Sequence, residues 1–178
     1  APALTSGYIS QLSQFNDVRL DFNGYSPSNY KDSYLGWTDA KTALKVSSNS
    51  IAVQLLNELG VEYAKEYAKQ AGLVFHENDN SLALALGGMT YGVTSLELSG
   101  AYMTIANGGL YTGPTFIKKI ADDGGHTIYS HEMTVSRVFT EEASYLLTDM
   151  LMETAKTGTA KKLSILPFDI AAKTGSVG

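Results

Sequence analysis

The sequence predicts a mixed α/β fold of the α+β kind, a single domain that is mostly helical with a little antiparallel strand. Several segments with helical apolar periodicity are bounded by residues that begin or end helices. One segment has two short β-prone runs on either side of Asp-Asp-Gly-Gly, which favours a hairpin. The 178 residues are enough for one domain with its own core but hardly for two, and no repeat or linker-like stretch divides them.

The first third of the chain predicts two helices after an irregular start. Residues 1–35 predict a short helix end followed by loops, because Gly, Asn, Ser, Pro and Tyr cluster in "DFNGYSPSNYKDSYLGW". A short helix is expected over residues 39–46. A longer helix is expected over residues 51–59, with Asn49 or Ser50 as its N-cap.

The middle of the chain predicts two further helices and the hairpin. Residues 61–71 carry acidic and basic side chains three apart, which is typical of a solvated helix face. Thr94 and Glu97 form a capping-box pattern at the start of the next helix. Residues 115–132 then place two β-prone runs around the Asp-Asp-Gly-Gly turn.

The composition excludes several classes of function. The formal net charge of −5 argues against a nucleic-acid partner, since phosphate binding needs a basic face. The chain has no cysteine, and no apolar run approaches the length of a membrane-spanning helix. The three histidines, His76, His126 and His131, have neither metal-ligand spacing nor a nucleophile partner. We therefore expect no metal and no organic cofactor.

The chain contains two Lys-Thr-Gly triplets, and the first is explained as a helix end. A helix is predicted to begin after Thr140, with an apolar face that ends near Thr154. Lys156 then lies in the last turn, where a cation interacts favourably with the helix dipole. Gly158 is expected to supply the left-handed residue that ends the helix.

The second triplet, Lys173-Thr174-Gly175, has no helical surroundings. It follows a proline and the short apolar run "FDIAA", which predicts a strand with Lys173 and Thr174 on opposite faces. A glycine at the end of such a strand allows the backbone of a ligand to approach closely. An ordinary strand leading to a turn is the alternative, because the string Lys-Thr-Gly is common.

A third string adds weight to the second triplet. Ser47-Ser48-Asn49 is the only Ser-x-Asn of the chain, and it lies between two predicted helices. A Ser-x-Asn loop followed at long range by Lys-Thr-Gly forms two of the three motifs of penicillin-binding proteins and serine β-lactamases. "YSPSNYKDSYLG", "ALKVSSNSIAVQL" and "LALGGMTYGVTSLELSGAYMTIANGG" match further family patterns almost end to end. The sequence thus resembles the transpeptidase domain of class A penicillin-binding proteins, which have a helical subdomain beside an antiparallel sheet.

The resemblance implies catalytic roles for Ser47, Asn49 and Lys173. Ser47 would relay a proton to the leaving amine, and Asn49 would bind the amide of the substrate near the scissile bond. Lys173 would supply positive charge beside Ser47 and the substrate carboxylate. Without the resemblance, helix capping would be the favoured explanation of Ser47 and Asn49, since Ser and Asn are common N-caps.

The resemblance also implies a substrate-binding edge. The hydroxyls of Thr174 and Ser176 would bind the substrate carboxylate, Gly175 would allow its close approach, and the N–H of Ser176 would form half of an oxyanion hole. The implied partners are peptidoglycan stem peptides ending in D-Ala-D-Ala, β-lactams as inhibitors, and the remainder of the same polypeptide. The implied place is the outer face of the bacterial cytoplasmic membrane, anchored by a segment outside this chain.

The family's nucleophile motif, Ser-x-x-Lys at the start of a helix, is expected to lie before Ala1. The chain has one such string, from Ser28 to Lys31, but it lies in a loop rich in Pro, Asn and Tyr and too close to Ser47. Residues 1–178 are therefore expected to form a single partial transpeptidase domain that lacks the nucleophile helix and the strands after the third motif. Alone, this fragment should be inactive.

Three other functions compete with D,D-transpeptidase. A serine β-lactamase would have the same fold and rapid hydrolysis of the acyl-enzyme, although the long "GVTSLELSGAYMTIANGG" match favours the transpeptidase. A non-catalytic relative would bind muropeptides or β-lactams through the same scaffold. A phosphate-binding loop is disfavoured, because it needs Gly-Lys-Thr between a strand and a helix and this chain has Lys-Thr-Gly.

Overall fold

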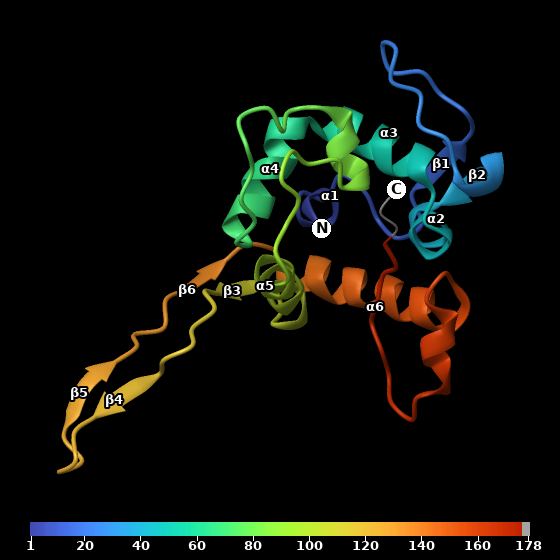
Figure 1. Cartoon of the computed structure of the whole chain (residues 1–178). Helices are drawn as coiled ribbons and strands as arrows, with labels where there is room; N and C mark the ends of the chain where they lie inside the picture. Colours follow the sequence, from blue (N-terminus) through green and yellow to red (C-terminus); the bar gives the residue numbers. More distant parts are fainter. Residues whose placement is uncertain (176–178) are drawn as a thin grey trace.

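The computed structural model describes residues 1–175, which form a helical body with a long β-ribbon projecting from it (Figure 1). The helices are α1 (Pro2–Thr5), α2 (Ala40–Val46), α3 (Asn49–Leu59), α4 (Val61–Gln70), α5 (Ser95–Ala106) and α6 (Glu141–Thr157), with 3-10 turns η1 (Tyr30–Asp32), η2 (Leu82–Leu86) and η3 (Lys161–Ile165). The strands are β1 (Gln14–Asp17), β2 (Gly36–Asp39), β3 (Leu110–Thr112), β4 (Lys119–Ala121), β5 (Thr127–Ser130) and β6 (Val135–Arg137). The predicted mixed fold of helices and antiparallel strand is confirmed.

Helix α6 organises the body. Its N-cap is Thr140, whose hydroxyl accepts the N–H of Ala143 at 3.1 Å, as predicted. Its buried face packs with α1, β1, α2 and α3 in one apolar cluster that consists of Leu4, Phe15, Ala40, Ala43, Ile51, Ala143 and Met150. Burying one large aliphatic side chain of this kind contributes about 1.5–3 kcal/mol, so this cluster stabilises the position of α2 and α3 on α6.

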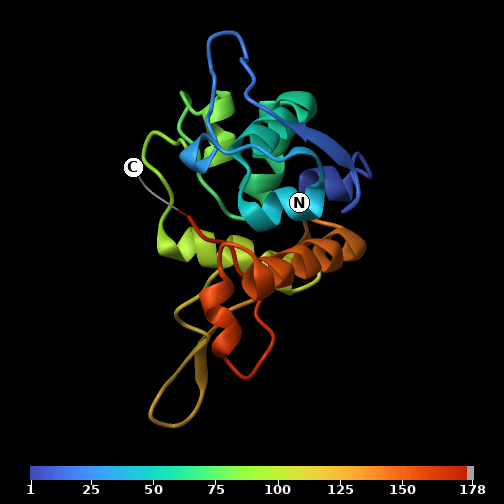
Figure 2. The same ribbon diagram turned by 90° about the vertical axis from the view of Figure 1, so that its right-hand side faces the viewer.

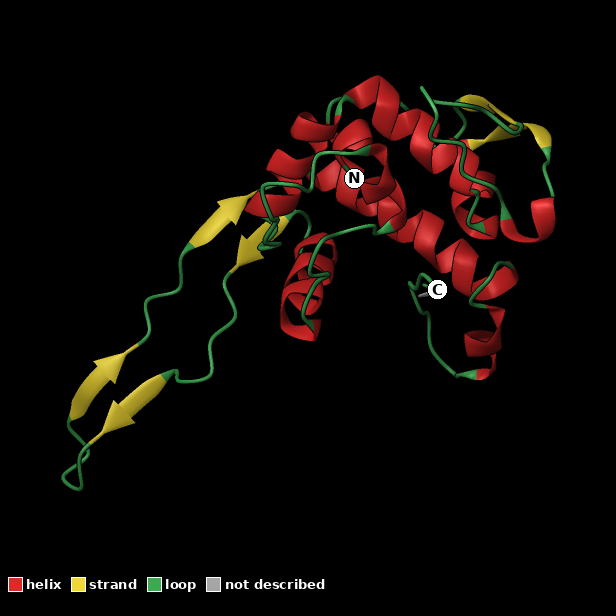
Figure 3. Ribbon diagram, turned by 45° about the horizontal axis from the view of Figure 1, so that its top comes forward, coloured by secondary structure: helices red, strands yellow, loops and turns green. Residues whose placement is uncertain are grey.

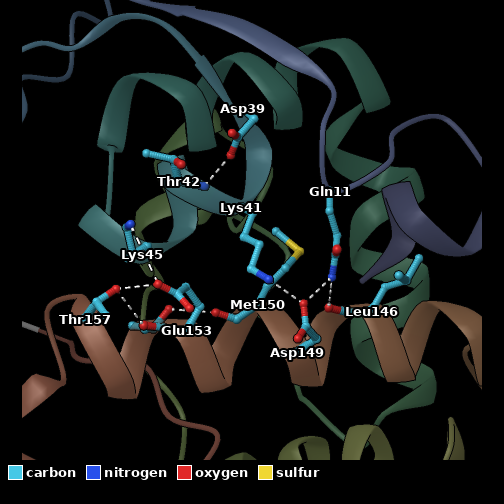
Figure 4. Close-up of polar contacts among 11 residues, drawn as sticks. Gln11, Asp39, Lys41, Thr42, Lys45, Leu146, Asp149, Met150, Glu153 and Thr157 are labelled. Atoms are coloured by element: carbon cyan, nitrogen blue, oxygen red, sulfur yellow. Dashed lines mark hydrogen bonds and ion pairs between the residues drawn. The ribbon is translucent and has the colours of Figure 1, made fainter.

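Ion pairs and hydrogen bonds also hold α2 along α6 (Figure 4). Lys41 Nζ lies 2.6 Å from Asp149 Oδ2, and Gln11 Nε2 donates to that oxygen at 2.9 Å. The hydrogen bond from Lys41 lowers the pKa of Asp149, and the same contact raises the pKa of Lys41. One turn further on, Lys45 Nζ lies 3.8 Å from Glu153 Oε1. The two ion pairs, at Lys41 near the start of α2 and at Lys45 near its end, hold α2 along α6.

The predicted hairpin is confirmed and extends well away from the helices (Figures 1 and 3). At its base β3 pairs antiparallel with β6, in register Leu110↔Arg137, and at its tip β4 pairs with β5. The turn is held by Asp122, whose Oδ1 accepts the N–H of His126 at 2.8 Å. Among the helices of residues 1–175, none combines the length and the hydrophobicity that spanning a bilayer requires.

The first 35 residues contain more order than the sequence indicates. The short α1 is confirmed, but the segment predicted as loop contains β1, which pairs antiparallel with β2 in register Gln14↔Asp39. The chain between them projects from the body as a long loop (Figure 2). Local patterns missed this sheet because its strands have four residues each and pair across about twenty intervening residues.

Candidate active site

The Ser-Ser-Asn string forms the junction of α2 and α3. Ser47 ends α2 with left-handed backbone angles (φ 63°, ψ 48°), and the N–H of Ser48 then bonds back to Ala43 O at 2.9 Å. Ser48 caps α3, because its hydroxyl accepts the N–H of Ile51 at 3.2 Å. The prediction of Asn49 or Ser50 as N-cap was therefore wrong by one or two positions. Ser48 is the residue with extended angles, and Asn49 is already helical.

Lys173 meets Ser47 from the other end of the chain. The last described residues lie beside α6 and approach α2 (Figure 1). Lys173 Nζ donates to Ser47 Oγ at 2.7 Å and to Thr174 O at 3.0 Å. Within residues 1–175 no carboxylate lies within ion-pair distance of this amine. Burial lowers the pKa of Lys173, so the neutral amine forms more readily than in a solvated lysine.

The segment that carries Lys173 is not a strand in the described part of the chain. Residues 171–175 have no ladder partner there, and the N–H of Ala172 makes a single long-range backbone bond, to Leu151 O at 3.3 Å. The predicted strand is therefore not present, because a strand needs a paired neighbour and this segment lies along a helix. Lys173 and Thr174 nevertheless point to different partners.

Thr174 contacts Thr159, the residue that follows the first triplet. Its hydroxyl donates to Thr159 Oγ1 at 2.7 Å, and the N–H of Thr159 donates to Lys45 O at 3.1 Å on α2. Gly158 has φ −99° and ψ −150°, so the prediction of a left-handed glycine was wrong. The glycine is needed for space instead, because a Cβ there would lie 2.5 Å from Lys45 O.

Thr159 thus belongs to the contacts of the candidate site, and sequence reasoning missed it. The first triplet was explained completely as a helix end, and it is one: α6 ends at Thr157, and the Lys156 amine lies 3.5 Å from Asp169 at the surface. Nothing local distinguishes Thr159 from a solvated residue after a helix. Only the close packing of Gly158 against α2 brings its hydroxyl to Thr174.

Asn49 lies on the same loop as Ser47 but is held by other contacts. Its Nδ2 donates to Ser28 O at 2.8 Å, and its N–H donates to Asn29 Oδ1 at 2.8 Å. Its Oδ1 accepts no hydrogen bond from the described residues. The structure therefore brings Ser47, Lys173 and Thr174 into one chain of contacts, with Asn49 two residues from Ser47. Gly175 follows them at the surface, and Ser176 lies outside the described residues.

The rejected string from Ser28 to Lys31 is not helical. Lys31 has a positive φ of 56° inside the 3-10 turn η1, so Ser28 and Lys31 do not share a helix face. The amine of Lys31 lies 5.4 Å from the centre of the Tyr30 ring. Ser28 contributes to the site through its carbonyl, which binds Asn49.

A family model described as "Penicillin binding protein transpeptidase domain" matches residues 1–177. The chain belongs to this family. Penicillin-binding protein 1F of Bacillus subtilis is 40% identical over 175 residues, which cover 98% of this chain and 24% of the relative. Penicillin-binding protein 4 of the same organism is 34% identical, over 98% of the chain and 29% of the relative. The expected kinship with class A penicillin-binding proteins is confirmed, and the chain spans about a quarter of the length of these curated relatives.

Solved structures agree on the fold. The D,D-transpeptidase domain of a peptidoglycan glycosyltransferase from Eggerthella lenta superposes with a TM-score of 0.82 at 20% identity, over 98% of this chain and 50% of that one. The PonA1 protein from Mycobacterium tuberculosis, solved in complex with penicillin V, gives a TM-score of 0.78 at 21% identity, over 87% and 44%. The predicted penicillin-binding transpeptidase fold is confirmed.

Proposed function

We propose that this chain supplies the Ser-x-Asn and Lys-Thr-Gly motifs of a serine D,D-transpeptidase that cross-links peptidoglycan stem peptides. The observation that carries the proposal is the 2.7 Å contact between Lys173 Nζ and Ser47 Oγ. A serine outside residues 1–178 would attack the carbonyl of the penultimate D-Ala. The bond to the terminal D-Ala breaks, and an acceptor amine then resolves the acyl-enzyme.

The contact suits a proton relay. Because Ser47 Oγ accepts its hydrogen bond from Lys173, the hydroxyl proton of Ser47 is free to point toward a leaving amine. Once Ser47 gives up this proton, Lys173 Nζ donates a proton of its own to Ser47 Oγ. The lowered pKa of Lys173 favours this transfer, since a proton donor works best when its pKa lies near the operating pH.

The neighbouring hydroxyls suit a carboxylate. The exposed Thr174 and Thr159 hydroxyls lie 2.7 Å apart, and Lys173 Nζ lies 3.0 Å from Thr174 O. The Thr159 hydroxyl keeps its proton for a ligand, and the Thr174 hydroxyl can turn from Thr159 to a ligand, so both could donate to a carboxylate near the lysine. Gly175 would let the substrate backbone approach, and Ser176 would add its hydroxyl and N–H. The same groups would bind the carboxylate of a β-lactam, which imitates D-Ala-D-Ala. Asn49 Oδ1 would accept an N–H of the substrate.

Peptidoglycan stem peptides place the reaction outside the cytoplasmic membrane. We therefore propose that the whole protein acts at the extracytoplasmic face, held by a segment outside this chain. The rest of the same polypeptide would supply the nucleophile. Slow release of the acyl group would distinguish this enzyme from a serine β-lactamase, and any covalent labelling would distinguish it from a non-catalytic relative.

The two triplets provide a matched test in the full-length protein. Lys173→Ala should slow acylation by a fluorescent penicillin by about 10²-fold, because it removes the proton source of the relay. Lys156→Ala is the control, because Lys156, like Lys173, is followed by Thr-Gly. Its acylation rate should stay within about threefold of the wild-type rate. Equal losses would mean that the wrong triplet was assigned. A wild-type protein without an adduct by intact mass would overturn the enzyme assignment.

A further inference from the structure

Asp17 is a buried carboxylate that the proposed reaction does not use. It is 1% exposed, lies at the end of β1, and has no cationic partner within residues 1–175. Its Oδ1 accepts from Ser48 Oγ at 2.8 Å, Ser50 Oγ at 2.5 Å and Asn29 Nδ2 at 2.8 Å. Its Oδ2 accepts the N–H of Leu35 at 3.0 Å. Four donors from three segments of the chain therefore converge on one side chain.

Asn29 extends this cluster to the backbone of α3. Its Oδ1 accepts the N–H of Asn49 at 2.8 Å and the N–H of Ser50 at 3.1 Å. The first N–H groups of a helix have no partner within the helix, so such a remote acceptor acts as a second cap. Asn29 is itself 8% exposed, and its amide is oriented by Asp17.

The four residues of the loop alternate in their contacts. Ser48 and Ser50 are buried and bind Asp17, whereas Ser47 binds Lys173 and Asn49 binds Ser28 O. The inward residues thereby fix the direction in which the outward ones point. Ser47 also keeps left-handed backbone angles, which a non-glycine residue holds only when its surroundings enforce them.

We propose that Asp17, acting through Ser48, Ser50 and Asn29, is a positioning residue for the catalytic Ser47–Asn49 loop. This inference rests on the proposed function. An ionised carboxylate suits the task because it has only acceptor sites and can receive all four donors at once. Burial raises the pKa of Asp17, but the hydrogen bonds from Ser50, Asn29, Leu35 and Ser48 lower it more, so the group stays charged.

The test is Asp17→Asn in the full-length protein, which keeps the shape but replaces one acceptor oxygen with an NH₂ group. That group would face either the N–H of Leu35 or the three donors that now converge on Oδ1. Acylation by a fluorescent penicillin is measured over a range of concentrations, which separates the initial binding constant from the limiting rate constant. The limiting rate should fall by about tenfold or more, because small displacements of catalytic groups cost rate. Initial binding should change much less.

Asp79→Asn is the matched control. Asp79 is also buried, at 5% exposure, and accepts three hydrogen bonds, from the N–H and hydroxyl of Thr90 and the N–H of His76. It holds a loop that contributes no hydrogen bond to Ser47 or Lys173, so its limiting rate per folded molecule should stay within about twofold of wild type. Thermal unfolding by circular dichroism gives the folded fraction of each variant.

Ser50→Ala is a milder second variant, which removes one of the four donors and is used if Asp17→Asn does not fold. A lowered limiting rate with the control unaffected supports the inference. Wild-type rates in the Asp17 or Ser50 variant, or an equal loss in Asp79→Asn, would overturn it while leaving the proposed function standing. An unlabelled wild-type protein would overturn the proposed function, and this inference with it.

Discussion

Replacing Ser47 by glycine or by alanine should affect stability differently but abolish activity in both cases. Its left-handed backbone (φ 63°) costs a residue with a side chain about 1–2 kcal/mol, which glycine does not incur. Glycine loses about 0.5–1 kcal/mol more backbone entropy on folding. Ser47→Ala keeps the unfavourable backbone and loses the hydrogen bond from Lys173, which stabilises the fold by about 1 kcal/mol.

The free energy of unfolding of Ser47→Gly should therefore exceed that of Ser47→Ala by about 0.5–1 kcal/mol and lie near wild type. Urea unfolding of the full-length protein measures this difference from the shift of the transition that involves this domain. Acylation by a fluorescent penicillin should be lost equally in both variants, since neither has the relay hydroxyl. If Ser47→Gly were the less stable of the two, or if it acylated at the wild-type rate, the reasoning would be refuted.

Two further predictions concern the surroundings of this loop. Gly158→Ala should lower the free energy of unfolding, measured by urea titration, by about 1–3 kcal/mol, because the added Cβ would lie 2.5 Å from Lys45 O. Gly113→Ala is the control, and it should leave the free energy of unfolding unchanged because the space around the added Cβ is open. Hydrogen bonds hold the pKa of Asp17 below its usual value. Below about pH 4 the Asp17 carboxylate therefore takes up a proton in the unfolded chain while it stays ionised in the folded chain. Stability should consequently fall as the pH drops through this range, and Asp17→Asn should flatten the fall; an unchanged slope in acid titrations monitored by circular dichroism would contradict this.

Local features of the fold could be predicted because their causes lie a few residues apart. The reciprocal capping box of Thr94 and Glu97, the Thr140 cap and the Asp-Asp-Gly-Gly turn are all present. Each depends on a hydrogen bond between residues three or four positions apart, which a short pattern contains. The same reasoning misplaced the cap of α3, because Ser48, Asn49 and Ser50 all have suitable side chains and only the packing around Asp17 decides among them.

The helices, the hairpin and the family could be predicted without a structure, since long motif strings and local periodicity are properties of the chain. Three contacts could be seen only in the folded molecule: Lys173 with a serine 126 positions away, Thr159 with Thr174, and Asp17 with four donors. No local pattern contains these contacts, because each connects segments that are far apart along the chain. Their geometry is set by how α2 and α3 pack on α6 and β1, and that packing is a sum over the whole core.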